Sequence, residues 1–425
     1  MKKAIIAIIV FLLLNSFSPS YATDNLILAG EAGILIDGET GQVLYEKNAH
    51  LQLYPASTTK IMTGILAIEL GKMDDIVTVD QEVVNLTDGS HIALEPGEQV
   101  KLEYLMYALL VESANDSALA IAKHISGSID GFAKLMNEKA KKIGALNTNF
   151  VNPNGLHDEN HVTTAYDLAL IAKYAMQNEN FRQIVANYTY LIPPTNKKTE
   201  ARPLNSANKL LYSNQKIDVD GKAVPIKYEG VNGVKTGYTQ MAQNCLVTSA
   251  QKGNQKLISV VLKSNGRNVY SDTHKLLNYG FNNFEKVTLA YNNEFIDNIK
   301  IQNGKLPLIA GIIKNSLTLT IPKGSKDNIE KKIILNEAIE APIEKEQSLG
   351  KVEYFLKGEK IGETDIVSSL AVEEIPKVGM FKKILDKWYI ILFLILIISR
   401  SVYLIKKKKR RKKRSSLYKV PSSLK

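Results

Sequence analysis

The chain has 425 residues, 45% of them hydrophobic, and a formal net charge of +11. Residues 406–414 are nine consecutive cations, and removing them together with Lys2 and Lys3 leaves no net charge on the rest. This distribution excludes a basic nucleic-acid-binding surface on the folded part and indicates membrane topology signals at the two ends. The length leaves room for two or three domains with a sizeable core.

Residues 1–22 have the form of a secretory signal peptide. A basic start precedes an apolar run at 4–14, and Ala22 is the small residue that signal peptidase prefers before its cut. An uncleaved anchor is the alternative, but the apolar run is short for a membrane span. The single cysteine, Cys245, leaves an exported protein without an internal disulfide, and its apolar neighbours indicate a packed thiol.

Residues 32–37 and 43–45 are typical of two strands joined by a tight turn. A helix follows, which Ser57 and Thr58 can cap or open and which Gly71 ends. Apolar residues cover most of its circumference, so we expect it to be buried. Ser57 and Lys60 are three residues apart and share a face. A lysine in an apolar, cation-rich site can lose its charge and act as a base, and the Ser57 N–H can stabilise an oxyanion.

This Ser-x-x-Lys spacing is weak evidence alone, because it occurs six more times, starting at Ser206, Ser213, Ser249, Ser348, Ser416 and Ser422. The helical context and two later motifs distinguish Ser57 from these matches.

The second motif is Ser113-Ala114-Asn115, in a polar loop between an apolar helix at 101–111 and another that Asp116 or Ser117 can cap. Polar groups between buried helices need partners or a function. A hydroxyl at Ser113 can pass a proton between Lys60 and a leaving amine, while the Asn115 amide holds lysine and substrate. Further helices are expected at 131–142 and, with Thr164 as its cap, at 165–176.

The third motif is Lys235-Thr236-Gly237 in a strand at 231–237, and it occurs once, against roughly a tenth of one match expected by chance. Lys235 offers a fixed cation to a substrate carboxylate, and Thr236 can hydrogen-bond the same group. Gly237 lets a substrate backbone lie along the strand edge. Antiparallel strands at 244–249 and 257–263 and a helix starting at 272 complete the first domain.

This order of motifs resembles the penicillin-recognising serine enzymes. The surrounding residues, at 55–63, 111–116, 154–156, 163–167 and 233–239, closely resemble the low-molecular-mass D-alanyl-D-alanine carboxypeptidases, and the likeness covers about residues 26–356. It implies an α/β (α+β) fold with an antiparallel sheet and buried helices, followed by a small all-β domain. It implies no metal and no cofactor.

Carried over residue by residue, the resemblance makes Ser57 the nucleophile on the penultimate D-alanine carbonyl, Lys60 the proton acceptor and Ser113 the relay to the departing D-alanine. The implied substrate-binding residues are Asn115, Lys235, Thr236, Gly237, Tyr238 and Arg267. The backbone N–H groups of Ser57 and Tyr238 would form the oxyanion hole. The implied partners are peptidoglycan stem peptides as substrates and β-lactam antibiotics as inhibitors.

Helical periodicity disappears from about residue 284, after a catalytic domain at 23–283. We expect a small all-β domain at 284–375 that acts as a spacer, a linker at 376–387, a transmembrane helix at 388–405 and a basic cytoplasmic tail at 406–425. Eighteen helical residues span about 27 Å, just enough for a bilayer. The protein would be exported and anchored in the bacterial cytoplasmic membrane with its catalytic domain outside. A helix lying on the membrane, which family members often have, is the alternative.

Other chemistries have weaker support. A Ser-His-Asp triad has six histidines available but no Gly-x-Ser-x-Gly elbow. His157 and His161 have the spacing of a helical zinc site, but the segment follows Asn-Gly and is predicted to be a solvated loop. Glu112 is interpreted as a salt-bridge or capping residue. A serine β-lactamase, a non-catalytic wall-binding protein and a D,D-endopeptidase remain alternatives, although no Glu-x-x-Leu-Asn-like loop lies between Asn115 and Lys235.

Overall fold

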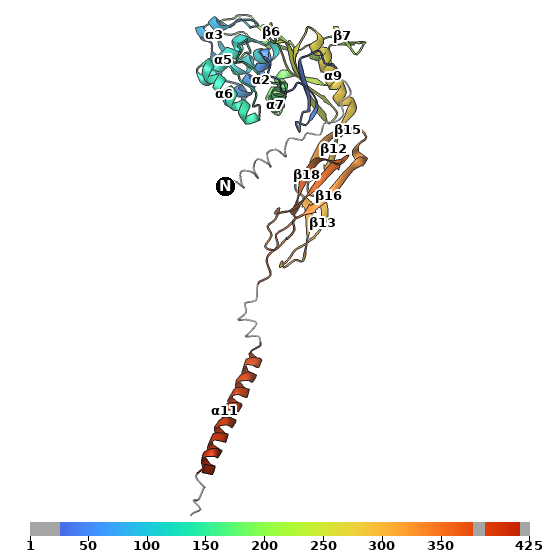
Figure 1. The fold of residues 1–425 in the computed structure, drawn as a ribbon. Coiled ribbons are helices and arrows are strands. Elements are labelled where there is room, and N and C mark those ends of the chain that lie inside the picture. The colour runs from blue at the N-terminus through green and yellow to red at the C-terminus, as the bar shows by residue number, and fades with distance from the viewer. Residues whose placement is uncertain (1–25, 377–386, 417–425) are drawn as a thin grey trace, which may run out of the picture. The chain divides into compact units, whose positions relative to one another are not determined.

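The computed structural model describes residues 26–376 and 387–416 (Figure 1). The predicted signal peptide and most of the predicted linker lie outside these residues. Of the described residues, a first compact unit holds 26–292, 315–333 and 352–364, and a second holds 293–314, 334–351 and the segments from 365 onward. The domain boundaries expected from the sequence stay predictions.

A five-stranded antiparallel sheet organises the first unit, in the order β2-β1-β11-β10-β9. Its strands are β1 (Ala32–Asp37), β2 (Val43–Lys47), β9 (Val231–Thr239), β10 (Gln243–Lys252) and β11 (Gln255–Ser264). The predicted hairpin and the three later strands are confirmed. In this sheet β9 is an edge strand, and Lys235 pairs with Val247 of β10. The Lys-Thr-Gly motif therefore lies along the free edge of the sheet, as expected.

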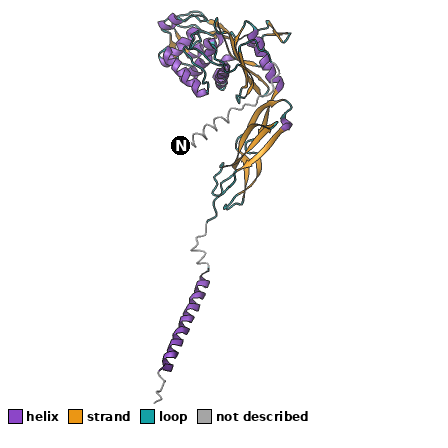
Figure 2. Cartoon of the chain, viewed as in Figure 1, coloured by secondary structure: helices purple, strands orange, loops and turns teal. Residues whose placement is uncertain are grey.

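Helices pack on both faces of this sheet (Figures 1 and 2). The alternation of side chains along β1 shows why: Ile34 and Ile36 belong to the core shared with α2 and α7, whereas Leu35 belongs to the core shared with α9. The first unit thus has three layers, with most helices on one face and α9 on the other. Its helical segments are η1 (Ala56–Thr59), α2 (Lys60–Leu70), α3 (Gln81–Leu86), α4 (Leu102–Tyr107), η2 (Ala108–Glu112), α5 (Asn115–Ser126), α6 (Ile129–Ile143), α7 (Ala165–Ala175), α8 (Glu179–Val185), η3 (Lys209–Leu211) and α9 (Asn268–Asn283).

The prediction that α2 is a core helix is confirmed, because every residue from Lys60 to Ala67 is buried. Thr164 caps α7 as predicted, and its hydroxyl accepts the Asp167 N–H. The helix expected at 101–111 is interrupted: α4 ends at Tyr107, and η2 continues it as a wider turn. The second motif begins directly after this wider turn, at Ser113.

Two-stranded ribbons extend from the helical layer and the sheet. They pair β3 (Ile76–Thr78) with β4 (Gln99–Lys101), β5 (Thr189–Ile192) with β6 (Arg202–Asn205), and β7 (Lys216–Val219) with β8 (Lys222–Pro225).

The region after α9 is built from strands, which confirms the predicted all-β character. β12 (Phe284–Ala290) pairs with β15 (Leu317–Pro322). A five-stranded sheet follows the order β13 (Phe295–Lys300), β14 (Leu308–Ile313), β18 (Glu359–Ser368), β17 (Ser348–Leu356) and β16 (Ile329–Leu335). Within residues 284–376, the short turn η4 (Lys326–Asn328) is the one helical segment.

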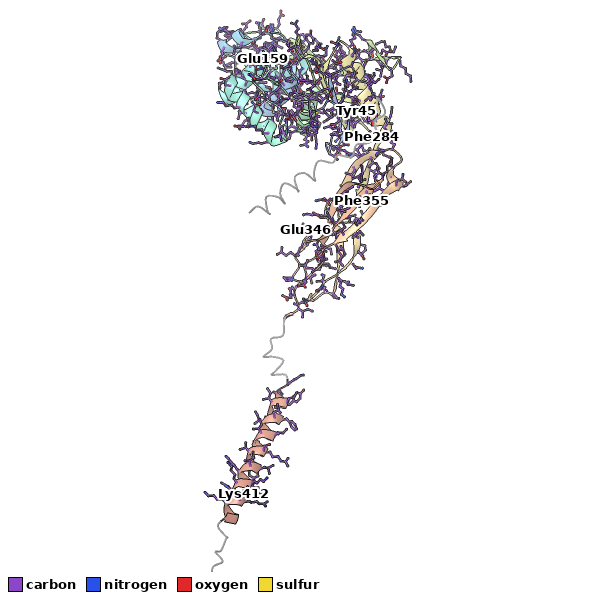
Figure 3. All side chains as sticks on the ribbon, viewed as in Figure 1. Tyr45, Glu159, Phe284, Glu346, Phe355 and Lys412 are labelled. Carbon is purple, nitrogen blue, oxygen red and sulfur yellow. The ribbon has the colours of Figure 1, made fainter. Side chains whose placement is uncertain are left out.

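The last described element is the helix α11 (Trp388–Ser416), whose side chains include the labelled Lys412 (Figure 3). Within the described residues, 388–413 is the one helical stretch long and apolar enough to cross a membrane. This finding is compatible with the predicted membrane anchor. The helix is longer than the predicted 388–405, because it continues through the run of cations instead of ending before it.

A buried ion pair between Arg202 and Glu98 gives the first prediction. Glu98 is fully buried, and its carboxylate lies 2.6 Å from Arg202 Nη2. Replacing Arg202 by alanine leaves that charge without its cation, so we expect the free energy of unfolding to fall by about 3–5 kcal/mol. Urea unfolding measures this free energy. The control is Lys101→Ala, which removes an exposed ion pair with Asp74. Equal losses in the two variants would contradict a stabilising role for the buried pair.

Candidate active site

Ser57 lies in the short turn η1, immediately before α2 begins at Lys60. Ser57 and Thr58 open the helix, as one of the two predicted roles has it, but the predicted cap is wrong. No side chain caps this turn, and the Thr58 hydroxyl instead donates to the Pro55 carbonyl. The Ser57 hydroxyl is thereby left to interact with Lys60. Among the described residues the Ser57 N–H also has no acceptor, so it remains available to stabilise an oxyanion.

Lys60 is fully buried, and its amine has three polar neighbours. Nζ lies 2.9 Å from Ser57 Oγ, 2.6 Å from Asn115 Oδ1 and 2.7 Å from the Asn154 carbonyl oxygen. When the amine is neutral, its two hydrogens can both go to the two amide oxygens. Its lone pair is then directed at the Ser57 hydroxyl, which is the geometry of a general base.

The surroundings of Lys60 favour this neutral form. Burial lowers the pKa of Lys60 well below its usual value, and the nearby charge of Lys235 lowers it further, while Asp116 opposes both effects. Desolvation removes water from an ammonium that has no carboxylate in direct contact, and this disfavours the charged form.

Asn115 connects the second motif to this amine. It begins α5, its Oδ1 accepts from Lys60, and its Nδ2 donates to the Asp88 carbonyl. The Asn115 N–H donates to the Ser90 carbonyl at 2.7 Å. These bonds fix the orientation of the amide, so its oxygen faces the lysine and stays an acceptor.

Ser113 ends η2 in a left-handed conformation, with φ 70° and ψ 29°. A non-glycine residue is uncommon there, and the sharp turn separates η2 from α5. The side chain is almost buried, and its hydroxyl has no hydrogen-bond partner in the described part of the chain. Its role as the proton relay stays a prediction.

The third motif reaches Ser57 through Gly237. A Cβ at this position would lie 2.9 Å from the Ser57 nitrogen and 3.0 Å from the Pro55 carbonyl oxygen. Only glycine allows β9 to approach η1 so closely. The three sequence motifs therefore converge, although 180 residues separate the first from the third.

Lys235 is also buried, and its ammonium donates to the carbonyl of Thr236 at 3.0 Å. Burial lowers the pKa of Lys235 to about 7, and the carboxylate of Glu112 opposes that shift. Glu112 accepts the Asn205 N–H and so acts on the lysine from a fixed position. The predicted salt bridge or helix cap of Glu112 is wrong, because its carboxylate accepts the backbone N–H of Asn205 instead.

Two predicted substrate-binding residues are not connected to the site by any contact of the described residues. Arg267 is exposed at the start of α9 and lines a pocket with Lys216, Asp218 and Lys275. Tyr238 is 65% exposed. Two roles therefore stay predictions: carboxylate binding by Arg267, and the contribution of the Tyr238 N–H to the oxyanion hole.

The sequence pattern did not identify Asp116 as a positioning residue. Its carboxylate is buried and accepts the N–H groups of Ile92 and Leu94, so it holds the segment whose carbonyls at Asp88 and Ser90 bind Asn115. Burial raises the pKa of Asp116, and these backbone bonds oppose the shift. The predicted capping role is wrong, because Ala114 is the N-cap of α5.

The predicted solvated loop at 157–161 is wrong at its end, because His161 is buried and both of its ring nitrogens have protein partners. It therefore has no nitrogen free for a metal. The packed-thiol interpretation of Cys245 is confirmed: the side chain is buried, its Sγ contacts the Tyr54 carbonyl, and burial raises its pKa to about 12.

Comparisons with known proteins agree with this geometry. Residues 20–266 match the family model described as D-alanyl-D-alanine carboxypeptidase, and residues 284–374 match that of the penicillin-binding protein 5 C-terminal domain. D-alanyl-D-alanine carboxypeptidase DacF of Bacillus subtilis (strain 168) is 33% identical over 403 residues, covering 91% of this chain and 99% of DacF. DacA of Escherichia coli (strain K12) is 32% identical over 371 residues, covering 84% and 86%.

Among solved structures, penicillin-binding protein 5 of Haemophilus influenzae is similar with a TM-score of 0.72 and 29% sequence identity. The match covers 83% of this chain and the whole of that one. With the family model matching more than half of the chain and relatives similar over most of their length, the chain belongs to the D-alanyl-D-alanine carboxypeptidases, a family of penicillin-binding serine peptidases that act on the peptides of peptidoglycan.

Proposed function

We propose that this protein removes the terminal D-alanine from peptidoglycan stem pentapeptides through an acyl-enzyme on Ser57. The observation that supports this role best is the buried Lys60 amine 2.9 Å from the Ser57 hydroxyl, beside the edge strand that carries Lys235. A nucleophile, an amine base and a cation beside one strand edge fit a substrate with a carbonyl close to a free carboxylate.

In the acylation step, Ser57 Oγ bonds to the carbonyl carbon of the penultimate D-alanine while its proton passes to Lys60 Nζ. The Ser57 and Tyr238 N–H groups stabilise the oxyanion. When the peptide bond breaks, Ser113 passes a proton to the departing amine, and free D-alanine leaves. Water then attacks the ester, Lys60 takes up its proton, and Ser57 is restored when the shortened peptide departs.

The two lysines need opposite protonation states. Lys60 must be neutral to accept a proton, and Lys235 must be charged to bind the terminal carboxylate. The charge of Lys235 lowers the pKa of Lys60, while Glu112 raises that of Lys235, so the arrangement favours this combination. A bound carboxylate stabilises the Lys235 cation further.

A β-lactam presents a strained amide and a carboxylate to the same groups. Attack by Ser57 opens its ring, but the leaving nitrogen stays attached to the acyl group and blocks the water. Intact-mass analysis after penicillin exposure, with peptide mapping, tests the proposal: we expect one added penicillin on Ser57. A label on another residue, or rapid turnover without a label, would contradict it, and the second outcome would favour a β-lactamase.

We place the catalytic domain on the outer side of the cytoplasmic membrane. α11 supplies an apolar segment of spanning length, and the run of cations at its end fits the cytoplasmic side. Stem peptides of the cell wall would then lie on the same side as Ser57. Protease accessibility of the catalytic domain in intact spheroplasts would test this orientation.

Replacing Lys235 by alanine is expected to raise KM for a D-Ala-D-Ala peptide by about 10- to 100-fold, the loss of one charge-assisted hydrogen bond, with a smaller effect on kcat. Because the pKa of Lys235 is about 7, kcat/KM in the parent enzyme should fall as pH rises through that value, since the neutral amine no longer attracts the carboxylate.

Steady-state release of D-alanine across pH 5–9 measures both effects. Lys222→Ala, which removes an exposed lysine on β8, is the control. An unchanged KM in Lys235→Ala would show that another group binds the carboxylate. Comparing pentapeptides with cross-linked dimers in the same assay separates carboxypeptidase from endopeptidase activity.

A further inference from the structure

His161 is buried, whereas the residues just before it are polar and largely exposed. Glu159, labelled in Figure 3, is one of the exposed residues. Its Nδ1 is 3.0 Å from the Val151 nitrogen, and its Nε2 is 2.8 Å from the Thr59 hydroxyl. Thr59 lies between the nucleophile Ser57 and the base Lys60. The ring therefore connects the catalytic turn, here residues 56–63 of η1 and the start of α2, with a segment about 100 residues later in the chain.

The Val151 contact determines the tautomer. A backbone N–H can only donate, so Nδ1 must present its lone pair, and the ring proton must be on Nε2. Nε2 then donates to the Thr59 oxygen. Burial lowers the pKa of His161 to about 4, so the ring is neutral near neutral pH and keeps this pattern.

Residues 151–155 contact the catalytic turn at three further points. The Pro153 carbonyl accepts the Thr63 hydroxyl at 2.5 Å, and the Asn154 carbonyl accepts the Lys60 amine at 2.7 Å. Gly155 lies so close that a Cβ there would overlap the Ala56 carbonyl oxygen, at 1.9 Å. The position of this segment therefore determines where one of the two amide acceptors of Lys60 lies.

We propose that His161 is a positioning residue for the Ser57–Lys60 pair, acting through its Nε2–H bond to the Thr59 hydroxyl and its Nδ1 bond to the Val151 N–H. The ring touches neither substrate nor the reacting atoms. It holds the Asn154 carbonyl and the catalytic turn in register, so that the lone pair of Lys60 stays directed at Ser57 Oγ. Disturbing this link should slow acylation without weakening substrate binding, because the groups that bind the carboxylate lie on β9.

Thr59 offers a matched pair of variants. Thr59→Val keeps the shape of the side chain and removes the hydroxyl, whereas Thr59→Ser keeps the hydroxyl and removes a methyl group. At the ring, His161→Gln can still place an N–H near the Nε2 position, whereas His161→Asn can reach only the Val151 N–H. Each full-length variant is assayed for its rate of acylation by fluorescent penicillin, for kcat and KM in D-alanine release, and for its thermal unfolding midpoint.

We expect Thr59→Val and His161→Asn to acylate about tenfold more slowly, equivalent to about 1.4 kcal/mol, at unchanged KM. Thr59→Ser and His161→Gln should stay within about threefold of the parent, and Thr59→Val combined with His161→Asn should be no slower than either alone. Equal acylation by Thr59→Val and Thr59→Ser overturns the proposal. The proposal is also overturned if the loss of acylation rate in the four variants simply parallels the fall in their thermal unfolding midpoints.

This inference rests on the proposed function, and the same experiment separates the two. If the parent protein takes no penicillin on Ser57, the proposed function fails. If the parent is labelled on Ser57 and the Thr59 pair does not differ, the proposed function stands and the role of His161 fails.

Discussion

Ser57→Ala is expected to abolish covalent penicillin binding and to lower D-alanine release by at least about 10⁴-fold, the scale of loss when a serine nucleophile is removed. The physical reason is that the amine of Lys60 is directed at Ser57 Oγ, whereas the neighbouring Thr58 hydroxyl is engaged with the Pro55 carbonyl. Intact-mass analysis and an assay of released D-alanine measure the two effects.

The control for this variant is Ser348→Ala. Ser348 has the same Ser-x-x-Lys spacing, with Lys351, but it is exposed and lies in the β-rich region. It should label and turn over like the parent. Residual labelling of Ser57→Ala at a normal rate would assign the nucleophile to another residue, whereas a folded variant that binds penicillin reversibly would support an intact cleft that lacks only its nucleophile.

Lys60→Met is expected to slow acylation by about 10²–10⁴-fold, the usual contribution of a general base. Methionine fills a similar volume in this fully buried position, but it cannot accept the Ser57 proton. It also leaves the Asn115 and Asn154 oxygens without their donor, so some loss of stability should accompany the loss of rate. A time course of penicillin labelling measures the rate of acylation.

Lys60→Arg separates charge from basicity. A guanidinium stays protonated and can only donate, so a role as a base predicts that Lys60→Arg is as slow as Lys60→Met. If arginine instead restored most of the rate, the side chain would be acting as a fixed cation, and the proton would have to go elsewhere. Lys72→Met, at an exposed position just after α2, controls for the loss of a lysine as such.

The pH profile of acylation adds a test of the same assignment. Burial and the charge of Lys235 lower the pKa of Lys60, so the fraction of neutral amine rises with pH, and the rate should rise on the acid side of the profile. Lys235→Ala removes the second of these effects and should move that rise to higher pH. No movement would mean that the two lysines do not interact.

The sequence predicted the elements whose character depends on local pattern. The apolar circumference of α2, the alternation and turn of the β1–β2 hairpin, and the side-chain cap of α7 are all encoded within a few residues. The candidate residues Ser57, Lys60 and Lys235 could also be predicted, because they belong to short motifs that each need specific residue types.

The failures concern residues whose surroundings come from distant parts of the chain. The segment containing His161 has the composition of a solvated loop, yet the ring is buried because Thr59, Val151 and Phe150 surround it. Asp116 has the sequence signature of a helix cap, but its carboxylate binds backbone groups some 22 to 24 residues earlier. Local composition does not specify what packs against a polar residue.

By itself the sequence determined which groups could do the chemistry: a hydroxyl, an amine three residues later, a serine and an amide in a loop, and a lysine on a strand. Only the tertiary structure decided that they meet and which protonation states their surroundings favour. Gly237 lets β9 lie against the turn of Ser57, and full burial of Lys60 near the charge of Lys235 lowers its pKa and favours its neutral form. Desolvation and proximity depend on the whole fold, so neither can be read from the spacing of residues along the chain.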